Sequence, residues 1–263
     1  MSKVRWEEMF PDELERAVAE CPVAWISLGA LEAHGPHMAT GTDALDVHAI
    51  CLLAAQRYGG VVTPPSYWHL GGGETEHEYR WWSEQGKPNM WGLFLPADVF
   101  YPLFIALIRQ ADLLGFKVVM AVAGHGGGPE VDCRIIAKHY MQRSPLRVCS
   151  IGWWETIPEE HVAHGGRLET AHLMHFRPDL VDMGRLPTGR SGIAPAHPSC
   201  YDASPEQARP LVAMEVEALG RTSQELLAEY RPWPAHQVMS RQEIFPFWED
   251  IKRMEKDSLI EWP

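Results

Sequence analysis

The sequence predicts an α/β fold in which a mostly parallel sheet is covered by helices on both faces. Short apolar runs alternate with longer segments of helical spacing, which is the rhythm of βα units. The 263 residues are 46% hydrophobic and 22% charged, which is enough apolar material for one sizeable core. The chain contains no internal repeat and no low-complexity linker, so residues 1–263 are expected to form a single domain.

The expected elements follow one another along the chain. After a polar, helix-forming start, four apolar runs are expected to be buried strands: 23–28, 61–63, 118–123 and 148–151. Helical patterns bounded by Gly, Pro or capping residues cover 43–57, 98–114, 131–142, 166–176 and 205–230. The tail at 231–263 is rich in Pro and Trp. It either wraps over its own domain or docks on a neighbouring subunit, and the sequence leaves both open.

Charge and composition narrow the function. The net charge of −12 and the pI near 5.5 offer no basic patch, so we expect neither a nucleic-acid nor a membrane partner, but a small-molecule substrate. No apolar run approaches the ~20 residues that span a bilayer, and the start is not that of a signal peptide. We therefore expect a cytoplasmic protein. The five cysteines are widely spaced without a CxxC pair, which favours reduced thiols over disulfides or a thiolate zinc site.

The stretch LGALEAHGPHMATGTD, at 28–43, directly follows the first expected strand. Glu32 and His34 lie beyond its carboxyl end, where open α/β sheets bind ligands. Two residues apart in an extended segment, they point to the same side, and Asp43 begins the next helix. Carboxylate and imidazole groups are ligands for Zn²⁺ or Mn²⁺. The same residues also fit a helix cap at Asp43 and an ordinary loop hydrogen bond.

Two further clusters follow other expected elements. His125 comes after the strand at 118–123 and is flanked by Gly124 and 126–128, which let the backbone approach a ligand or metal closely. A dinucleotide loop or an oxyanion motif is disfavoured, because Pro129 follows the glycines and the chain has no G-x-S-x-G. In the third cluster Glu169 lies in the first turn of an otherwise apolar helix, where an unpaired carboxylate would be costly.

Taken together, these elements resemble the creatininase (creatinine amidohydrolase) family. The resemblance rests on Glu32-Ala-His34-Gly-Pro-His37 with Asp43, the triglycine 71–73, Gly124-His125-Gly126-Gly127, and His164-Gly-Gly-x-x-Glu169-Thr170, in family order. It implies a three-layer α/β/α sandwich and a site for two divalent ions, Zn²⁺ or Mn²⁺. It further implies hydrolysis of small cyclic or linear amides, and a homo-oligomer, of which a hexamer is one form.

The resemblance also implies roles for individual residues. Glu32 and His125 correspond to ligands of one metal, His34 to a ligand of the other, and Asp43 to the carboxylate that bridges both. Creatininase takes a further Glu where this chain has Gly127, so Glu169 is the preferred fifth metal ligand.

The substrate region departs from creatininase. Leu70 stands where creatininase has Ser, and Glu160-His161 replace its Trp-Asp pair. An expanded stretch, EYRWWSEQGKPNMW, carries Trp82 and is either a lid or a subunit contact. We take Trp82, Trp154 and His161 as candidate substrate-binding residues. We expect creatinine to be a poor substrate.

The predicted function is therefore two-metal hydrolysis of a small cyclic amide, formamide or related C–N substrate. Two divalent ions lower the pKa of a shared water and polarise a carbonyl oxygen. His164, matching a substrate-site histidine of the family, is the candidate acid for the leaving nitrogen. Ring opening of a cyclic ketone or lactone, and a metal-stabilised binding or assembly protein without turnover, are the alternatives.

Overall fold

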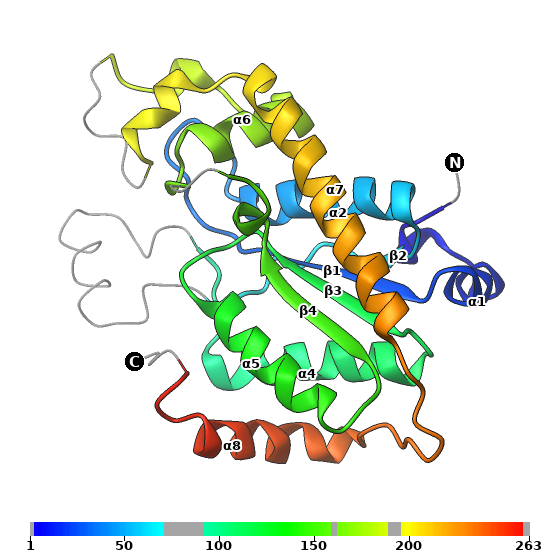
Figure 1. The fold of residues 1–263 in the computed structure, drawn as a ribbon. Coiled ribbons are helices and arrows are strands. Elements are labelled where there is room, and N and C mark those ends of the chain that lie inside the picture. Colours follow the sequence, from blue (N-terminus) through cyan, green and yellow to red (C-terminus); the bar gives the residue numbers. More distant parts are fainter. Residues whose placement is uncertain (1–2, 71–91, 159–161, 189–195, 260–263) are drawn as a thin grey trace.

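A four-stranded parallel sheet forms the centre of the computed structural model, which describes residues 3–70, 92–158, 162–188 and 196–259 (Figure 1). The strand order is β2-β1-β3-β4, with β1 at Val23–Leu28, β2 at Val61–Val62, β3 at Val118–Ala123 and β4 at Arg147–Gly152. The central strands β1 and β3 pair along their whole length, and every residue of both is buried. Their carboxyl ends therefore lie side by side at one edge of the sheet.

Helices cover both faces of this sheet, which confirms the predicted three-layer α/β/α fold (Figure 1). One face carries α2 (Thr42–Tyr58), α6 (Arg167–Phe176) and α7 (Pro205–Glu229). The other carries α4 (Ala97–Leu113), α5 (Pro129–Met141) and α8 (Ile244–Met254), and α1 (Pro11–Glu20) lies beside β2. Short 3-10 helices occupy Trp6–Glu8, Trp153–Thr156, Pro178–Leu180, Met183–Arg185, Pro198–Asp202 and Arg241–Glu243.

The strands divide their side chains between two cores. Ala24 and Ile26 pack into the core on the α4, α5 and α8 side, whereas Val23 and Trp25 pack into the core beneath α2 and α7. This division follows from the two-residue period of a strand. A strand buried on both faces needs apolar residues at every position, which is why the sequence signal was a continuous run.

The predicted boundaries agree closely with the structure. The strands at 23–28 and 118–123 are confirmed residue for residue, and the other predicted elements begin and end within two residues of the expected positions. The largest shift is at α5, which begins at Pro129 rather than at 131. Proline suits the first position of a helix because it has no N–H to leave unpaired there.

The described part of the tail packs on its own chain. α8 contacts α4 and α5, the Trp248 indole N–H donates to Asp98 at 2.8 Å, and His236 lies 3.0 Å from Asp112. These contacts fit the first alternative for this segment, and a contact with a neighbouring subunit stays a prediction. Among the described residues, no helix is long and apolar enough to cross a membrane.

Candidate metal centre

The amino end of α2 approaches the ends of β1 and β3 very closely, and two glycines make this possible. A Cβ at Gly29, after β1, would lie 2.4 Å from the Ala44 backbone, and one at Gly124, after β3, would lie 2.2 Å from the Asp43 carbonyl oxygen. Any side chain at either position would push α2 away. The close approach places Asp43, in the first turn of α2, between the two strand ends.

Asp43 faces one histidine with each of its carboxylate oxygens. Its Oδ1 lies 2.8 Å from His34 Nε2, and its Oδ2 lies 3.2 Å from His125 Nδ1. Glu32 completes one group, with Oε1 at 2.9 Å from His125 Nδ1, and Glu169 completes the other, with Oε2 at 3.7 Å from His34 Nε2. The five predicted ligands therefore form two groups of three that share Asp43, and Glu32 and His34 form a third such group with His164.

The His34 ring presents a bare nitrogen to this cluster. Its Nδ1–H donates to the Glu32 backbone carbonyl at 3.2 Å, which in the neutral ring leaves Nε2 as the lone-pair nitrogen. That nitrogen is fully buried and has no hydrogen-bond partner among the described residues, although Asp43 Oδ1 lies 2.8 Å away. A hydrogen bond from the first nitrogen that fixes the tautomer is typical of histidine metal ligands.

The buried carboxylates require positive charge at this point. The side chains of Glu32, Asp43 and Glu169 are 6%, 2% and 13% exposed. Burial opposes a charge on His125, yet Glu32 and then Asp43 raise its pKa to about 10. The neighbouring carboxylates, Asp43 first, likewise raise the pKa of His34 well above 6.5 against the effect of burial. Both pKa shifts have the same cause, which is the negative charge that the neighbouring carboxylates concentrate at this point.

This donor set fits two divalent ions. Three carboxylates carry a charge of −3, close to the +4 of two ions. Ligands at ~2.1 Å from a tetrahedral Zn²⁺ lie ~3.4 Å from one another, and the nitrogen–oxygen distances within the two groups, 2.8–3.7 Å, bracket this value. The donors are the nitrogen and oxygen ligands that Zn²⁺ and Mn²⁺ accept.

Glu169 is held in place by the start of its own helix. It lies in the first turn of α6, and its Oε2 accepts a hydrogen bond from the Gly165 backbone N–H at 2.5 Å. Burial raises the pKa of this carboxyl group. Gly127, where creatininase has Glu, has a φ of 103°, and a Cβ there would contact nothing within 4 Å.

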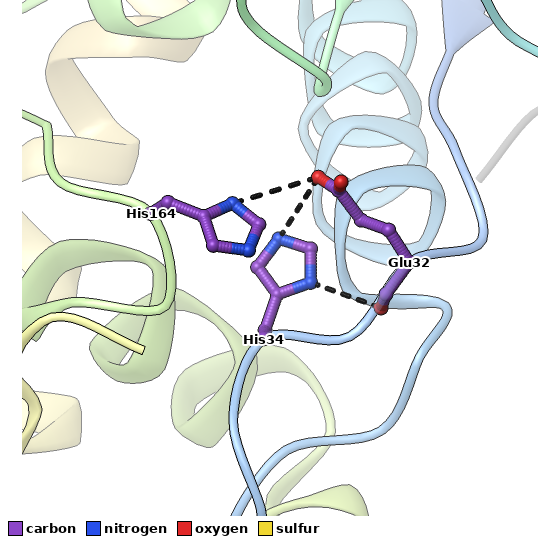
Figure 2. Close-up of side chains that lie close together, drawn as sticks. All are labelled: Glu32, His34 and His164. Atoms are coloured by element: carbon purple, nitrogen blue, oxygen red, sulfur yellow. Dashed lines mark hydrogen bonds and ion pairs between the residues drawn. The ribbon is translucent and has the colours of Figure 1, made fainter. Parts of the chain in front are cut away.

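His164 lies next to Glu32 and His34 (Figure 2). Its Nε2–H donates to the Ala33 carbonyl at 2.8 Å, and its Nδ1 faces Glu32 Oε1 at 3.6 Å. The ring centroid is 4.3 Å from that of His34, and the side chain is 35% exposed. His164 can therefore present Nδ1 either to an ion or to a substrate.

Aromatic residues stand beside His125. Phe94 and His69 lie with ring centroids 5.9 and 5.1 Å from the His125 ring. Trp154 packs over Gly126, where a Cβ would be 3.5 Å from the indole. The predicted residue Trp154 therefore lies next to the site. The positions of Phe94 and His69 beside His125 were not predicted, because neither residue lies in a motif typical of metal ligands.

The remaining candidate substrate-binding positions are not seen at the site. Trp82 and His161, and Glu160 with them, lie outside the described residues. Leu70 is fully buried in the core with Phe100, so its side chain does not line the site directly. A loss of the serine found in creatininase would thus act on the site only through packing.

The sequence is similar to a known protein family and to several individual proteins. A family model described as creatininase, creatinine amidohydrolase, matches residues 7–228. A creatinine amidohydrolase of Pseudomonas putida is 25% identical over 211 residues, covering 71% of this chain and 75% of that protein. A mycofactocin precursor peptide peptidase of Mycolicibacterium smegmatis is 28% identical over 177 residues, covering 65% and 64%.

Solved structures agree on the fold. A structure titled "Creatininase Mn" matches with a TM-score of 0.67 and 22% identity over 88% of this chain and 100% of that chain. A creatininase variant of Zn-Zn type matches with a TM-score of 0.66, the same identity and the same coverage.

Proposed function

The chain belongs to the creatininase family, and we propose on this basis that it is a metal-dependent hydrolase of the C–N bond in a small, preferably cyclic, amide other than creatinine. The observation that carries the proposal is the position of Asp43, whose two oxygens face two histidines in overlapping ligand groups. The two relatives are named for different amide substrates, creatinine and a precursor peptide, so the family name leaves the substrate open.

Each of the two ligand groups that share Asp43 is proposed to hold one ion. Glu32, Asp43 and His125 hold one ion, and His34, Asp43 and Glu169 hold the other. We propose Zn²⁺ or Mn²⁺, since the structural neighbours include a Mn and a Zn-Zn creatininase. When bound, such ions supply Lewis acidity toward a carbonyl oxygen and lower the pKa of water.

His164 is proposed to deliver a proton to the leaving nitrogen. Its Nε2–H is committed to the Ala33 carbonyl, so Nδ1 is the atom that holds the transferable proton. That atom faces Glu32, and the His164 side chain is 35% exposed, so a substrate nitrogen can approach. The Ala33 contact fixes the ring orientation, which limits the motion needed for transfer.

The substrate is proposed to have an apolar or aromatic portion. Phe94 offers partly exposed aromatic surface beside His125, and Trp154 does so beside Gly126. Trp82 and His161 remain proposed substrate contacts from the sequence. Discrimination in such a site depends on shape and on polar groups around the substrate rather than on the ions.

The test combines metal analysis with a substrate panel. Protein purified without chelator is analysed for Zn and Mn, stripped with EDTA and reconstituted with each ion. It is then assayed on creatinine, lactams, cyclic ureides, formamides, short peptides, lactones and cyclic diketones. We expect about two ions per chain and metal-dependent turnover of an amide. Fewer than two ions per chain after reconstitution, or turnover of lactones or diketones alone, would contradict the proposal.

A further inference from the structure

A buried hydrogen bond joins two segments that carry metal ligands. The Oγ1 of Thr170, the residue after Glu169 in α6, lies 3.0 Å from Nε2 of His37. His37 belongs to the loop between β1 and α2, three residues after His34. The two partners are 133 residues apart in sequence, and they are 0% and 1% exposed.

His37 has no alternative partner in the described structure. Its Nδ1 is buried and has no hydrogen-bond partner among the described residues, so Thr170 supplies the hydrogen bond of this ring. Buried polar groups are costly to leave unpaired. The contact therefore favours one particular separation between the loop and α6.

The surrounding backbone leaves little freedom for that separation to change. The loop is fastened to the segment after α6, since Ala39 N–H donates to Leu180 O at 3.1 Å and Asp182 N–H donates to His37 O at 2.8 Å. At the start of α6, a Cβ on Gly165 would lie 2.6 Å from the His34 carbonyl oxygen. The loop therefore contacts the chain both before Glu169, at Gly165, and after α6, at Leu180 and Asp182.

We propose that His37 and Thr170 form a positioning pair that fixes Glu169 relative to His34, and so sets the affinity of the ion held by His34, Asp43 and Glu169. The inference rests on the proposed metal centre. The other ion, held by Glu32, Asp43 and His125, has no ligand on α6. The pair should therefore act on one of the two ions, a selectivity that a general loosening of the fold would not produce.

The test is a metal titration of full-length protein. Metal-free wild type and Thr170→Val are titrated with Zn²⁺ in competition with a chelating dye, which resolves the two dissociation constants. Loss of a contact that orients a ligand typically lowers metal affinity ~10–100-fold. We expect a loss of this size for one ion in Thr170→Val, an unchanged second ion, and near wild-type affinities in Thr170→Ser, which keeps the hydroxyl.

Ser223→Ala is the matched control. Ser223 is also fully buried, and its hydroxyl donates to Gly220 O at 2.7 Å within α7, away from the ligand groups. Its loss should lower the unfolding temperature of metal-free protein and leave both affinities unchanged. If Thr170→Val does not fold, His37→Phe tests the same pair, because it keeps an aromatic ring and removes the nitrogen.

The outcomes separate the two proposals. A wild type that binds fewer than two ions overturns the proposed metal centre, and the pair with it. A wild type that binds two ions, with Thr170→Val binding both at wild-type affinity, overturns the pair alone. Equal weakening of both ions also overturns it, since the effect would then be general destabilisation.

Discussion

Replacing Asp43 by Ala should remove both ions, because this carboxylate is the one side chain shared by both ligand groups. After the change, each ion keeps two protein ligands: Glu32 and His125 for one, His34 and Glu169 for the other. His34→Ala removes a ligand from one group only. The two variants therefore differ in the number of ions they lose.

The expected loss of metal affinity is larger for Asp43→Ala because Asp43 is a ligand in both groups. Loss of a contact outside the ligand set costs ~10–100-fold in metal affinity, so loss of a ligand should cost at least ~100-fold, or ~2.7 kcal/mol per ion. Asp43→Ala should thus forfeit ~5 kcal/mol of metal-dependent stabilisation, and His34→Ala about half of that, at ion concentrations well above the wild-type dissociation constants.

Elemental analysis after desalting, and urea unfolding with and without Zn²⁺, measure both quantities. Asp46→Ala is the control. Asp46 lies one turn further along α2, and as a whole residue it is 5% exposed, compared with 4% for Asp43. It belongs to none of the ligand groups found among the described residues. Because Asp46 is in no ligand group, its removal should leave two ions bound. Two ions retained in Asp43→Ala, or equal losses in both variants, would refute the bridging role.

Three further outcomes are expected. His164→Gln should keep both ions while kcat on the best substrate falls ~10²–10⁴-fold; loss of an ion in this variant would make His164 a ligand instead. Burial, and then the charge of Arg5, lowers the pKa of His48 from 6.5 to about 4, so the unfolded chain takes up a proton before the folded chain as the pH falls. The contribution of His48 to stability is therefore full above pH 6.5 and is lost toward pH 4, and the urea midpoint of wild type relative to His48→Gln should drop across this window in metal-free protein; a constant difference would contradict this. Creatinine should be turned over poorly with saturating Zn²⁺ or Mn²⁺, and a kcat/KM at or above ~10⁴ M⁻¹s⁻¹ would show that the substrate region is misinterpreted.

The sequence was most informative where local pattern and fold coincide. β1 and β3 were predictable to the residue because a six-residue run buried on both faces has few alternatives. Glu32 and His125 were predicted at one metal from the family resemblance, and both follow strands that end at the same edge of the sheet. Their distances could not be predicted, because these depend on how closely α2 approaches Gly124.

Contacts between distant segments gave no local signal. His69 and Phe94 are joined by an isolated parallel bridge, and both rings lie beside His125. The pairing of His37 with Thr170 likewise joins positions 133 residues apart. A single sequence records neither contact, since each residue taken alone resembles an ordinary buried side chain.

The exchange of Glu for Gly at position 127 shows why the centre tolerates a change in its ligands. The left-handed backbone at Gly127, with a φ of 103°, disfavours any side chain there, so a Glu would be strained as well as redundant. In the proposed centre α6 supplies the third carboxylate instead, through Glu169, so the charge of −3 is kept. What changes is the element that carries the ligand. The loop after β3 then carries no carboxylate ligand, and a Cβ at Gly127 would contact nothing within 4 Å. This open space suits the proposed apolar or aromatic portion of the substrate.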